Sequence, residues 1–346
     1  VKNGGVATFS LLQRAAVNNV LELREDWRLT SDLDLNIPEG QTLTIVGNGN
    51  HIYELGGRLL NSGEGEVVFA AKTYLYPSAS DSVDGTFVAI GSSDGIVLNE
   101  SAPYYSNGDN AASAEAETWN AYFDAANNTL NLNELNIAES LLVPGGITIN
   151  VQGNNTIDTA QTAAPGIAWL SDGDVTLSGD GGLTVKSSGE YTVGNKISET
   201  EGAGYKGGII IGGDVKLNIE NAKASGSCIL IYGQNCGVEI KDNADVTLKN
   251  LEENGYCIRV KNNGDIKVAD DAKLEGTGVF HIEDENLGEN TRGSVVIDSS
   301  KPVEIDGNDS GQNITIYAKT VTVKEGAALN IKNTSRAVSH QQSTNL

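Results

Sequence analysis

Residues 173–177 read GDVTL, and close variants of this string recur through the second half of the chain. They are GDVKL at 213–217, GVEI at 237–240, GDIKV at 264–268 and GSVVI at 293–297, with steps of 40, 24, 27 and 29 residues, and KTVTV at 319–323 continues the series. Apolar residues alternate with polar ones in all of these strings except GSVVI, as in a strand with one buried face. A short strand that recurs at a roughly fixed period indicates a solenoid of stacked coils.

The first hundred residues carry the same kind of repeat. The triplets Leu21-x-Leu23, Leu43-x-Ile45 and Val67-x-Phe69 are separated by 22 and 24 positions, with further strand-like segments at 33–37 and 51–55. About three strands per turn is the arrangement expected of a β-helix. We therefore predict an all-β, right-handed parallel β-helix, with a short N-terminal capping helix over residues 9–17.

The repeats also suggest a division of the chain. We predict N-terminal coils with their cap over residues 1–100 and the main parallel β-helix over residues 101–346. The long first step of 40 residues is explained by an insert near residues 189–206, because long inserts are how single coils of a solenoid acquire local specialisation.

The composition limits the possible partners. Asp and Glu number 46 against 23 Lys and Arg, which gives a formal charge of −23 at pH 7. This charge argues against nucleic acid and anionic membranes as partners, and it favours cations. The sequence has no run of 18 apolar residues, so we expect no membrane insertion in this segment, and no signal-peptide pattern opens it.

Three longer strings carry a resemblance to a known group. They are WNAYFDAANNTLNL from Trp119, GITINVQGNNTI from Gly146 and GDVTLSGDGGLTV from Gly173. They resemble bacterial cell-surface parallel β-helix proteins, described as carbohydrate-binding, within the pectin-lyase-like superfamily, over roughly residues 119–332. The resemblance implies a secreted or cell-surface location and a polysaccharide or surface glycan as partner. Such motifs encode turns and core ladders, so they are specific for architecture and weak for activity.

One face of the predicted helix carries candidate binding residues. Aligning Ile229-x-Ile231, Ile258-x-Val260, Phe280-x-Ile282 and Ile314-x-Ile316 as an inward ladder directs the residues between and after them outward. The predicted outward pairs on successive rungs are Leu230 and Tyr232, Arg259 and Lys261, His281 and Glu283, and Thr315 and Tyr317. The candidate ligand-binding residues are therefore Tyr232, Arg259, Lys261, His281, Glu283 and Tyr317.

This surface is compatible with three functions. Its rings and charged groups could bind a sugar chain, or another surface partner, without catalysis. Arg259, Lys261, His281 and Glu283 could instead serve a polysaccharide lyase or glycoside hydrolase. Arg259-Val260-Lys261 resembles the R-I-K element of polygalacturonases, but the acidic pair Asp270-Asp271 and His281 follow it instead of preceding it. The outward residues of a soluble sheet are polar in any case, so a passive adhesin stalk is the third possibility.

Acidic turns are candidate calcium sites, and two cysteines are candidates for a disulfide. Weak calcium candidates, which would make glycan binding Ca²⁺-assisted, are Glu283, Asp284, Glu285, Glu289, Asp306 and Asp309, because Ca²⁺ prefers oxygen ligands. Their spacing matches neither an EF-hand nor a nonapeptide calcium repeat. Cys228 and Cys257 each precede an aligned triplet by one residue, so they should stack on adjacent rungs, and the sequence leaves open whether they form a disulfide.

Overall fold

We analysed a computed structural model of the chain. The structure describes residues 19–24, 27–29, 33–46, 52–54, 59–70, 75–76, 88–91, 96–98, 100, 102–108, 111–115, 118–169, 172–195, 207–233, 236–252, 255–261, 263–283, 293–307, 315–334 and 336–339. The predicted capping helix at 9–17 lies outside them. The chain forms two compact units, residues 1–85 with 91–96 and residues 86–90 with 97–346, which are described separately below. All regular elements in the described ranges are strands, and a search of these ranges finds no helix able to cross a membrane.

The first unit contains three stacks of short parallel strands. The stacks are β1 (Val20–Glu22), β4 (Thr42–Val46) and β7 (Glu66–Ala70); β2 (Trp27–Leu29), β5 (Ile52–Glu54) and β8 (Leu75–Tyr76); and β3 (Leu33–Asp34) with β6 (Leu59–Leu60). Leu43 and Ile45 are fully buried in the hydrophobic core of this unit. Leu21 pairs with Ile45 and Leu43 pairs with Val67, so the predicted alignment of Leu21 with Leu43 was wrong by two residues.

The second unit is built from three sheets, which we call I, II and III in the order in which each coil visits them. Sheet I contains β12 (Ala111–Ser113), β11 (Tyr104–Ser106), β13 (Ala121–Asp124), β14 (Thr129–Asn133), β17 (Thr148–Gln152), β20 (Val175–Gly179), β23 (Ile209–Ile211), β26 (Val238–Ile240), β29 (Ile266–Asp270), β32 (Ser294–Ser299) and β35 (Thr320–Val323).

Sheet II contains β15 (Asn136–Ile137), β18 (Asn154–Thr159), β21 (Gly182–Ser187), β24 (Lys216–Asn221), β27 (Asp245–Asn250), β30 (Lys273–Thr277), β33 (Val303–Asp306) and β36 (Leu329–Lys332). Sheet III contains β10 (Ile96–Leu98), β9 (Val88–Ile90), β16 (Leu141–Val143), β19 (Ile167–Trp169), β22 (Tyr191–Gly194), β25 (Ser227–Ile231), β28 (Tyr256–Lys261), β31 (Val279–Glu283), β34 (Ile316–Tyr317) and β37 (Val338–Ser339).

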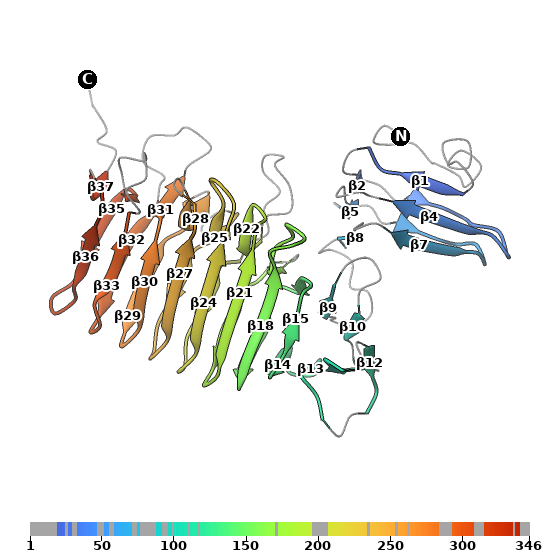
Figure 1. The fold of residues 1–346 in the computed structure, drawn as a ribbon, viewed down its shortest axis with the longest axis horizontal. Coiled ribbons are helices and arrows are strands. Elements are labelled where there is room, and N and C mark those ends of the chain that lie inside the picture. The colour runs from blue at the N-terminus through green and yellow to red at the C-terminus, as the bar shows by residue number, and fades with distance from the viewer. Residues whose placement is uncertain are drawn as a thin grey trace. The chain divides into compact units, whose positions relative to one another are not determined.

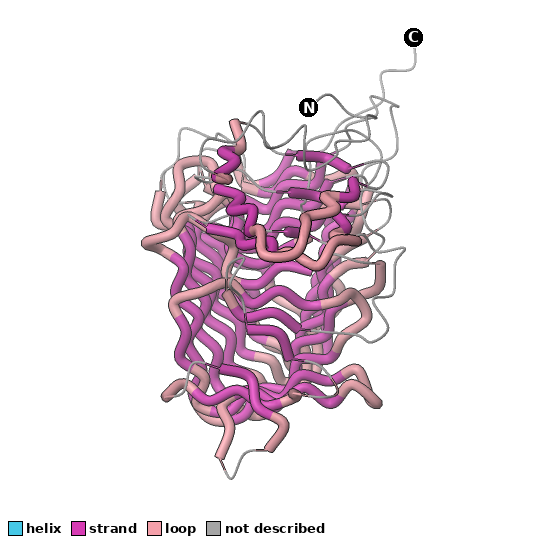
Figure 2. Tube along the Cα trace, turned by 90° about the vertical axis from the view of Figure 1, so that its right-hand side faces the viewer, coloured by secondary structure: helices cyan, strands magenta, loops and turns pink. Residues whose placement is uncertain are grey.

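From β14 onward the chain runs through sheets I, II and III in turn, and each strand pairs in parallel with its equivalent one coil later (Figure 1). Figure 2, turned by 90°, shows strands of successive coils following one another with loops at the corners. Inward apolar residues fill the interior, as in β21, where Leu183 and Val185 are buried and their neighbours are partly exposed. The protein is therefore all-β and a right-handed parallel β-helix, as the repeats predicted.

One repeat string was assigned to the wrong sheet. Val175 of GDVTL pairs with Ile209 of β23, whereas Leu217 of GDVKL pairs with Leu183 and Val246 in sheet II. Strands of sheets I and II have the same alternation of apolar and polar residues, so the string alone could not separate them. The later strings do lie in sheet I, and Val321 of KTVTV pairs with Val295 as predicted.

The second unit begins with antiparallel strands. β11 and β13 run antiparallel to their neighbours, and β13 pairs with β14 to start the parallel stack. Phe123 of β13 is buried, whereas the Tyr104 and Tyr122 rings stack at 4.8 Å on the outward face of these strands. Trp119 lies tilted against Tyr122 at 5.9 Å.

The three cysteines are free thiols and all are buried. Cys228 and Cys257 follow the paired residues Ser227 and Tyr256, which confirms that they occupy adjacent rungs. Burial raises the pKa of both thiols, since a thiolate is poorly solvated in an apolar interior. Cys236 accepts a hydrogen bond at its Sγ from the Gly207 N–H at 2.9 Å.

We therefore expect the folded protein to resist thiol reagents. At pH 8 the thiolate, which is the reactive form, is scarcely populated in Cys228 and Cys257 because their pKa values are raised. Ellman's reagent should release almost no thionitrobenzoate from the native protein and should titrate all three thiols in guanidinium. Rapid reaction of the native protein would contradict the burial of these side chains.

Candidate functional site

The candidate site lies on the outward face of sheet III, where β25, β28, β31 and β34 follow one another. Leu230 pairs with Arg259, Arg259 with His281, and His281 with Tyr317, so these four residues stand on consecutive rungs. The inward neighbours Ile229, Ile258, Phe280 and Ile316 form a fully buried ladder behind them. The rigid core therefore fixes the spacing of the outward side chains at about 4.8 Å per rung.

A continuous series of ring contacts crosses this face. The Arg259 guanidinium lies 4.8 Å from the centre of the Tyr256 ring, and that ring stacks on His281 with centroids 5.4 Å apart. The His281 ring then meets Tyr317 edge to face at 4.9 Å. We call these four residues, Tyr256, Arg259, His281 and Tyr317, the ring surface. All four are partly exposed, so the surface is open to solvent while its members hold one another in place.

A second cation–ring pair lies beside the ring surface. The Lys261 Nζ lies 5.1 Å from the centre of the Tyr232 ring. Tyr232 is only 5% exposed, so the expectation that it lies open on the surface was wrong, and Leu230 is fully buried as well. The Tyr232 ring thus packs against Lys261, and Lys261 is the more exposed member of this pair.

The last predicted rung was wrong by two residues. We expected Thr315 beside His281 and Tyr317 beside Glu283, but Tyr317 pairs with His281 and Ile316 pairs with Phe280. Thr315 is buried. The shift brings Tyr317 into direct contact with His281 and therefore makes the ring surface more compact than the sequence suggested. Ile314 lies outside the described residues.

Tyr256 is a member of the ring surface that the sequence did not reveal. The pairing of β28 with β31 shifts between Tyr256 and Ile258, so Cys257 and Ile258 are both buried although they are consecutive. This irregularity places Tyr256 outward, three residues before Arg259. Strict alternation from Ile258 would have given Tyr256 the same inward direction as Ile258.

Asn195 anchors the chain next to the Lys261 and Tyr232 pair. Its buried amide donates to the Tyr232 carbonyl at 2.7 Å and to the Gly207 carbonyl at 3.0 Å, and it accepts from the Tyr232 N–H at 2.5 Å. Asn195 and Gly207 are the described residues that flank 196–206 within the predicted insert. One side chain therefore links residues 195 and 207 to Tyr232, the residue that follows β25 of sheet III.

The acidic candidates do not join the ring surface in the described part of the chain. Glu283 occupies the rung beside Lys261, but its side chain and residues Asp284, Glu285, Glu289 and Asp309 lie outside the described set. Asp306 belongs to sheet II, where it lies 3.8 Å from the Lys332 Nζ and accepts hydrogen bonds from Asn333. No group of three or more His, Cys, Asp or Glu suited to a metal occurs among the described residues.

The acidic pair that a hydrolase would use lies elsewhere. Asp270 ends β29 of sheet I, and its Oδ2 accepts a hydrogen bond from the Asp242 N–H at 3.1 Å. Asp271 follows in the turn toward sheet II, whereas Arg259, Lys261 and His281 lie on sheet III. These carboxylates therefore stabilise turns. They are not positioned to act together with Arg259 and Lys261.

Fold and site together define a parallel β-helix with a partly exposed surface of aromatic rings and cations on one sheet. No protein-family model matches the chain, and no curated protein or solved structure shows significant similarity to it.

Proposed function

We propose that this protein is a non-catalytic, secreted or cell-surface β-helix that binds polysaccharide on sheet III. The observation that carries the proposal is the ring surface, with its contacts from Arg259 through Tyr256 and His281 to Tyr317. Aromatic side chains pack against the C–H faces of sugar rings, and guanidinium and imidazole groups donate hydrogen bonds to hydroxyl or carboxylate groups.

The repetition of the site along successive rungs favours a polymer over a small molecule. Each rung adds one side chain to the surface, so similar contacts repeat along the helix axis, as similar groups repeat along a sugar chain. The rings also contact one another before any ligand binds, which lowers the entropy lost on binding.

The net charge of −23 disfavours the binding of acidic polymers unless a cation bridges them to the protein. A uronate chain is repelled by the protein as a whole, although Arg259 and Lys261 attract it locally. Calcium ions would bridge carboxylates of the polymer to those of the protein. Binding of a uronate polymer should therefore need calcium, whereas binding of an uncharged polymer should not.

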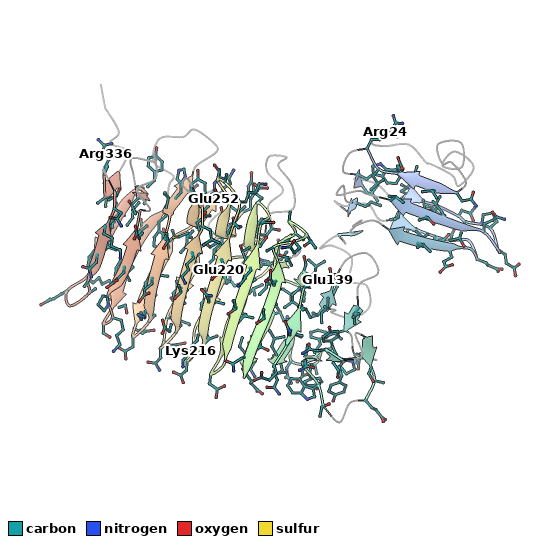
Figure 3. All side chains as sticks on the ribbon, in the orientation of Figure 1. Arg24, Glu139, Lys216, Glu220, Glu252 and Arg336 are labelled. Atoms are coloured by element: carbon teal, nitrogen blue, oxygen red, sulfur yellow. The ribbon has the colours of Figure 1, made fainter. Side chains whose placement is uncertain are left out.

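Removing one cation or one ring from the ring surface should weaken polysaccharide binding. Affinity electrophoresis in gels that contain polygalacturonate, alginate or dextran, with calcium or with EDTA, measures the effect. We expect wild-type protein to be retarded in a uronate gel with calcium, and Arg259→Ala and Tyr317→Ala each to weaken that interaction about tenfold. Lys216→Ala removes a positive charge from β24 of sheet II and should change affinity less than about twofold (Figure 3).

Two results would contradict the proposal. Wild-type protein that migrates unchanged in every gel would favour a passive stalk. Unsaturated or reducing ends released by wild-type protein, and not by Arg259→Ala, would favour a lyase or hydrolase.

A further inference from the structure

A straight row of outward side chains crosses the first strands of sheet I, a different sheet from the one that carries the ring surface. The row occupies the neighbouring strands β11, β13, β14, β17 and β20, and four strand spacings make it about 19 Å long. Register pairing joins each member to the next. We call its members, Tyr104, Tyr122, Asn131, Asn150 and Ser178, the sheet I row.

Aromatic rings form one end of the row. The Tyr104 and Tyr122 rings stack with centroids 4.8 Å apart, and the Trp119 ring lies 5.9 Å from that of Tyr122. All three side chains are partly exposed. The core does not need them, because the inward neighbours Tyr105 and Phe123 already fill it and are 3% and 1% exposed. Apolar surface thus gathers on the solvent side of these strands, which indicates a binding surface.

Side-chain amides continue the row beyond the rings. The Asn150 Nδ2 donates to the Asn131 Oδ1 at 2.9 Å, and the Asn131 Nδ2 donates to the Tyr122 carbonyl at 3.5 Å. These bonds hold the two amides in line with the rings. An amide has two N–H donors and an oxygen that accepts two bonds, which is more than these contacts use. Both asparagines can therefore bind a ligand without losing their present partners.

This part of sheet I is nearly free of charge. Asp124 is the single charged residue of β13, β14, β17 and β20, and its carboxylate accepts hydrogen bonds from the Asn127 N–H at 3.2 Å and Nδ2 at 2.7 Å. Later strands of the same sheet carry outward charges, such as the Glu239 and Lys267 pair. A charged polymer finds no local attraction at the row, and the net charge of −23 repels an anionic one. The surface therefore favours an uncharged ligand.

The width of the row argues for a single extended chain as its ligand. The rings and amides occupy a strip about 19 Å long and one or two side chains wide. A stable protein interface buries roughly 800 Å² on each partner, which is much more than this strip supplies.

We infer that the sheet I row binds an uncharged sugar chain. One sugar ring packs its C–H face on Trp119 and Tyr122, and hydroxyl groups of the following units exchange hydrogen bonds with Asn131 and Asn150. Hydroxyl and amide groups each donate and accept, so they pair without taking a charge out of water. This site is additional to the ring surface and does not depend on it.

Affinity electrophoresis in gels that contain hydroxyethylcellulose, galactomannan or dextran, all with EDTA, tests the inference. We expect at least one of these neutral polymers to retard wild-type protein. Trp119→Ala and Tyr122→Ala should each weaken that interaction about tenfold, because each removes a ring from the platform. Asn150→Ala should weaken it about threefold to tenfold through lost hydrogen bonds. Guanidinium unfolding of each variant checks that the fold is retained, and Asn150→Ala tests the row where no ring is removed.

Asn218→Ala is the matched control, because Asn218 is an outward asparagine on β24 of sheet II. It should change affinity less than about twofold. Wild-type protein that migrates unchanged in all three gels would overturn the inference, and so would equal losses in Asn150→Ala and Asn218→Ala. Retardation that is lost in Tyr317→Ala and kept in Trp119→Ala would assign the neutral polymer to the ring surface and would also overturn it. Uronate gels with calcium test the ring surface separately, so failure on sheet III and failure on sheet I can be told apart.

Discussion

Replacing Phe280 with alanine should cost about 3–5 kcal/mol of unfolding free energy, the range measured for deleting a large buried aromatic side chain. Phe280 is fully buried, and its backbone pairs with Ile258 on one side and Ile316 on the other. In a solenoid each rung contacts only its neighbours, so an empty volume at this rung cannot be filled from elsewhere. Guanidinium unfolding monitored by circular dichroism measures the loss as a lower midpoint.

Gly276 lies opposite Phe280 across the interior, and this arrangement allows a more specific test of the packing. Gly276 of β30 occupies an inward position whose register neighbours are Leu248 and Ile305. A Cβ added there would lie 3.4 Å from the Phe280 ring and 3.0 Å from the Cys257 sulfur. The Phe280 ring thus occupies space that a side chain at 276 would otherwise fill.

A double-mutant cycle tests this complementarity. Gly276→Ala alone should destabilise the protein by about 1–3 kcal/mol through overpacking, and Phe280→Leu alone by about 1–2 kcal/mol, because leucine leaves part of the ring's volume empty. The double variant should be more stable than the sum predicts, because leucine leaves room for the new methyl group. Additive effects, or a loss below about 1 kcal/mol for Phe280→Ala, would contradict the packing described here.

The inward face of sheet III was predictable from sequence, whereas part of its outward face was not. The alternation around Ile229, Ile258 and Phe280 gave the correct register, because burying apolar side chains permits only one alignment of these triplets. It also placed Arg259 beside His281. The sequence pattern thus predicts which sheet carries the ring surface.

The errors have local physical causes. Tyr256 was missed because the shift at Cys257 breaks the two-residue period on which the assignment relied. Tyr317 was displaced because the spacing of the repeats varies along the chain, and Ile314-x-Ile316 fitted the alternation as well as the true register did. Tyr232 was expected to be exposed, but it is 5% exposed, and its backbone is bound by Asn195, a partner 37 residues away. Local patterns cannot report such a contact.

Replacing Asn221 with alanine should cost about 3 kcal/mol, because it leaves a buried backbone carbonyl and a partly buried backbone N–H without their hydrogen bonds. Asn221 is fully buried at the corner between sheets II and III, where Ser187 and Asn250 are its register neighbours. Its Nδ2 donates to the Gly189 carbonyl at 3.0 Å, and its Oδ1 accepts from the Lys223 N–H at 3.0 Å. Both backbone groups would lose these bonds in the variant.

Asn250→Ala should behave in the same way one coil later. Its Nδ2 donates to the Gly226 carbonyl at 2.8 Å, and its Oδ1 accepts from the Glu252 N–H at 3.0 Å. The two asparagines thus make equivalent hydrogen bonds on successive coils. Each coil needs such bonds because it must turn between the sheets while burying main-chain polar groups.

Asn218→Ala is the matched control on the same strand, because Asn218 alternates outward and the hydrogen bond that its Nδ2 donates to Glu220 is long, at 3.4 Å. It should cost less than about 0.5 kcal/mol in the same guanidinium titration. Equal midpoints for Asn221→Ala and Asn218→Ala would mean that the corner does not depend on the buried amide. A large loss confined to Asn221 and Asn250 would instead establish that side-chain amides, together with the apolar ladder, determine where each coil turns.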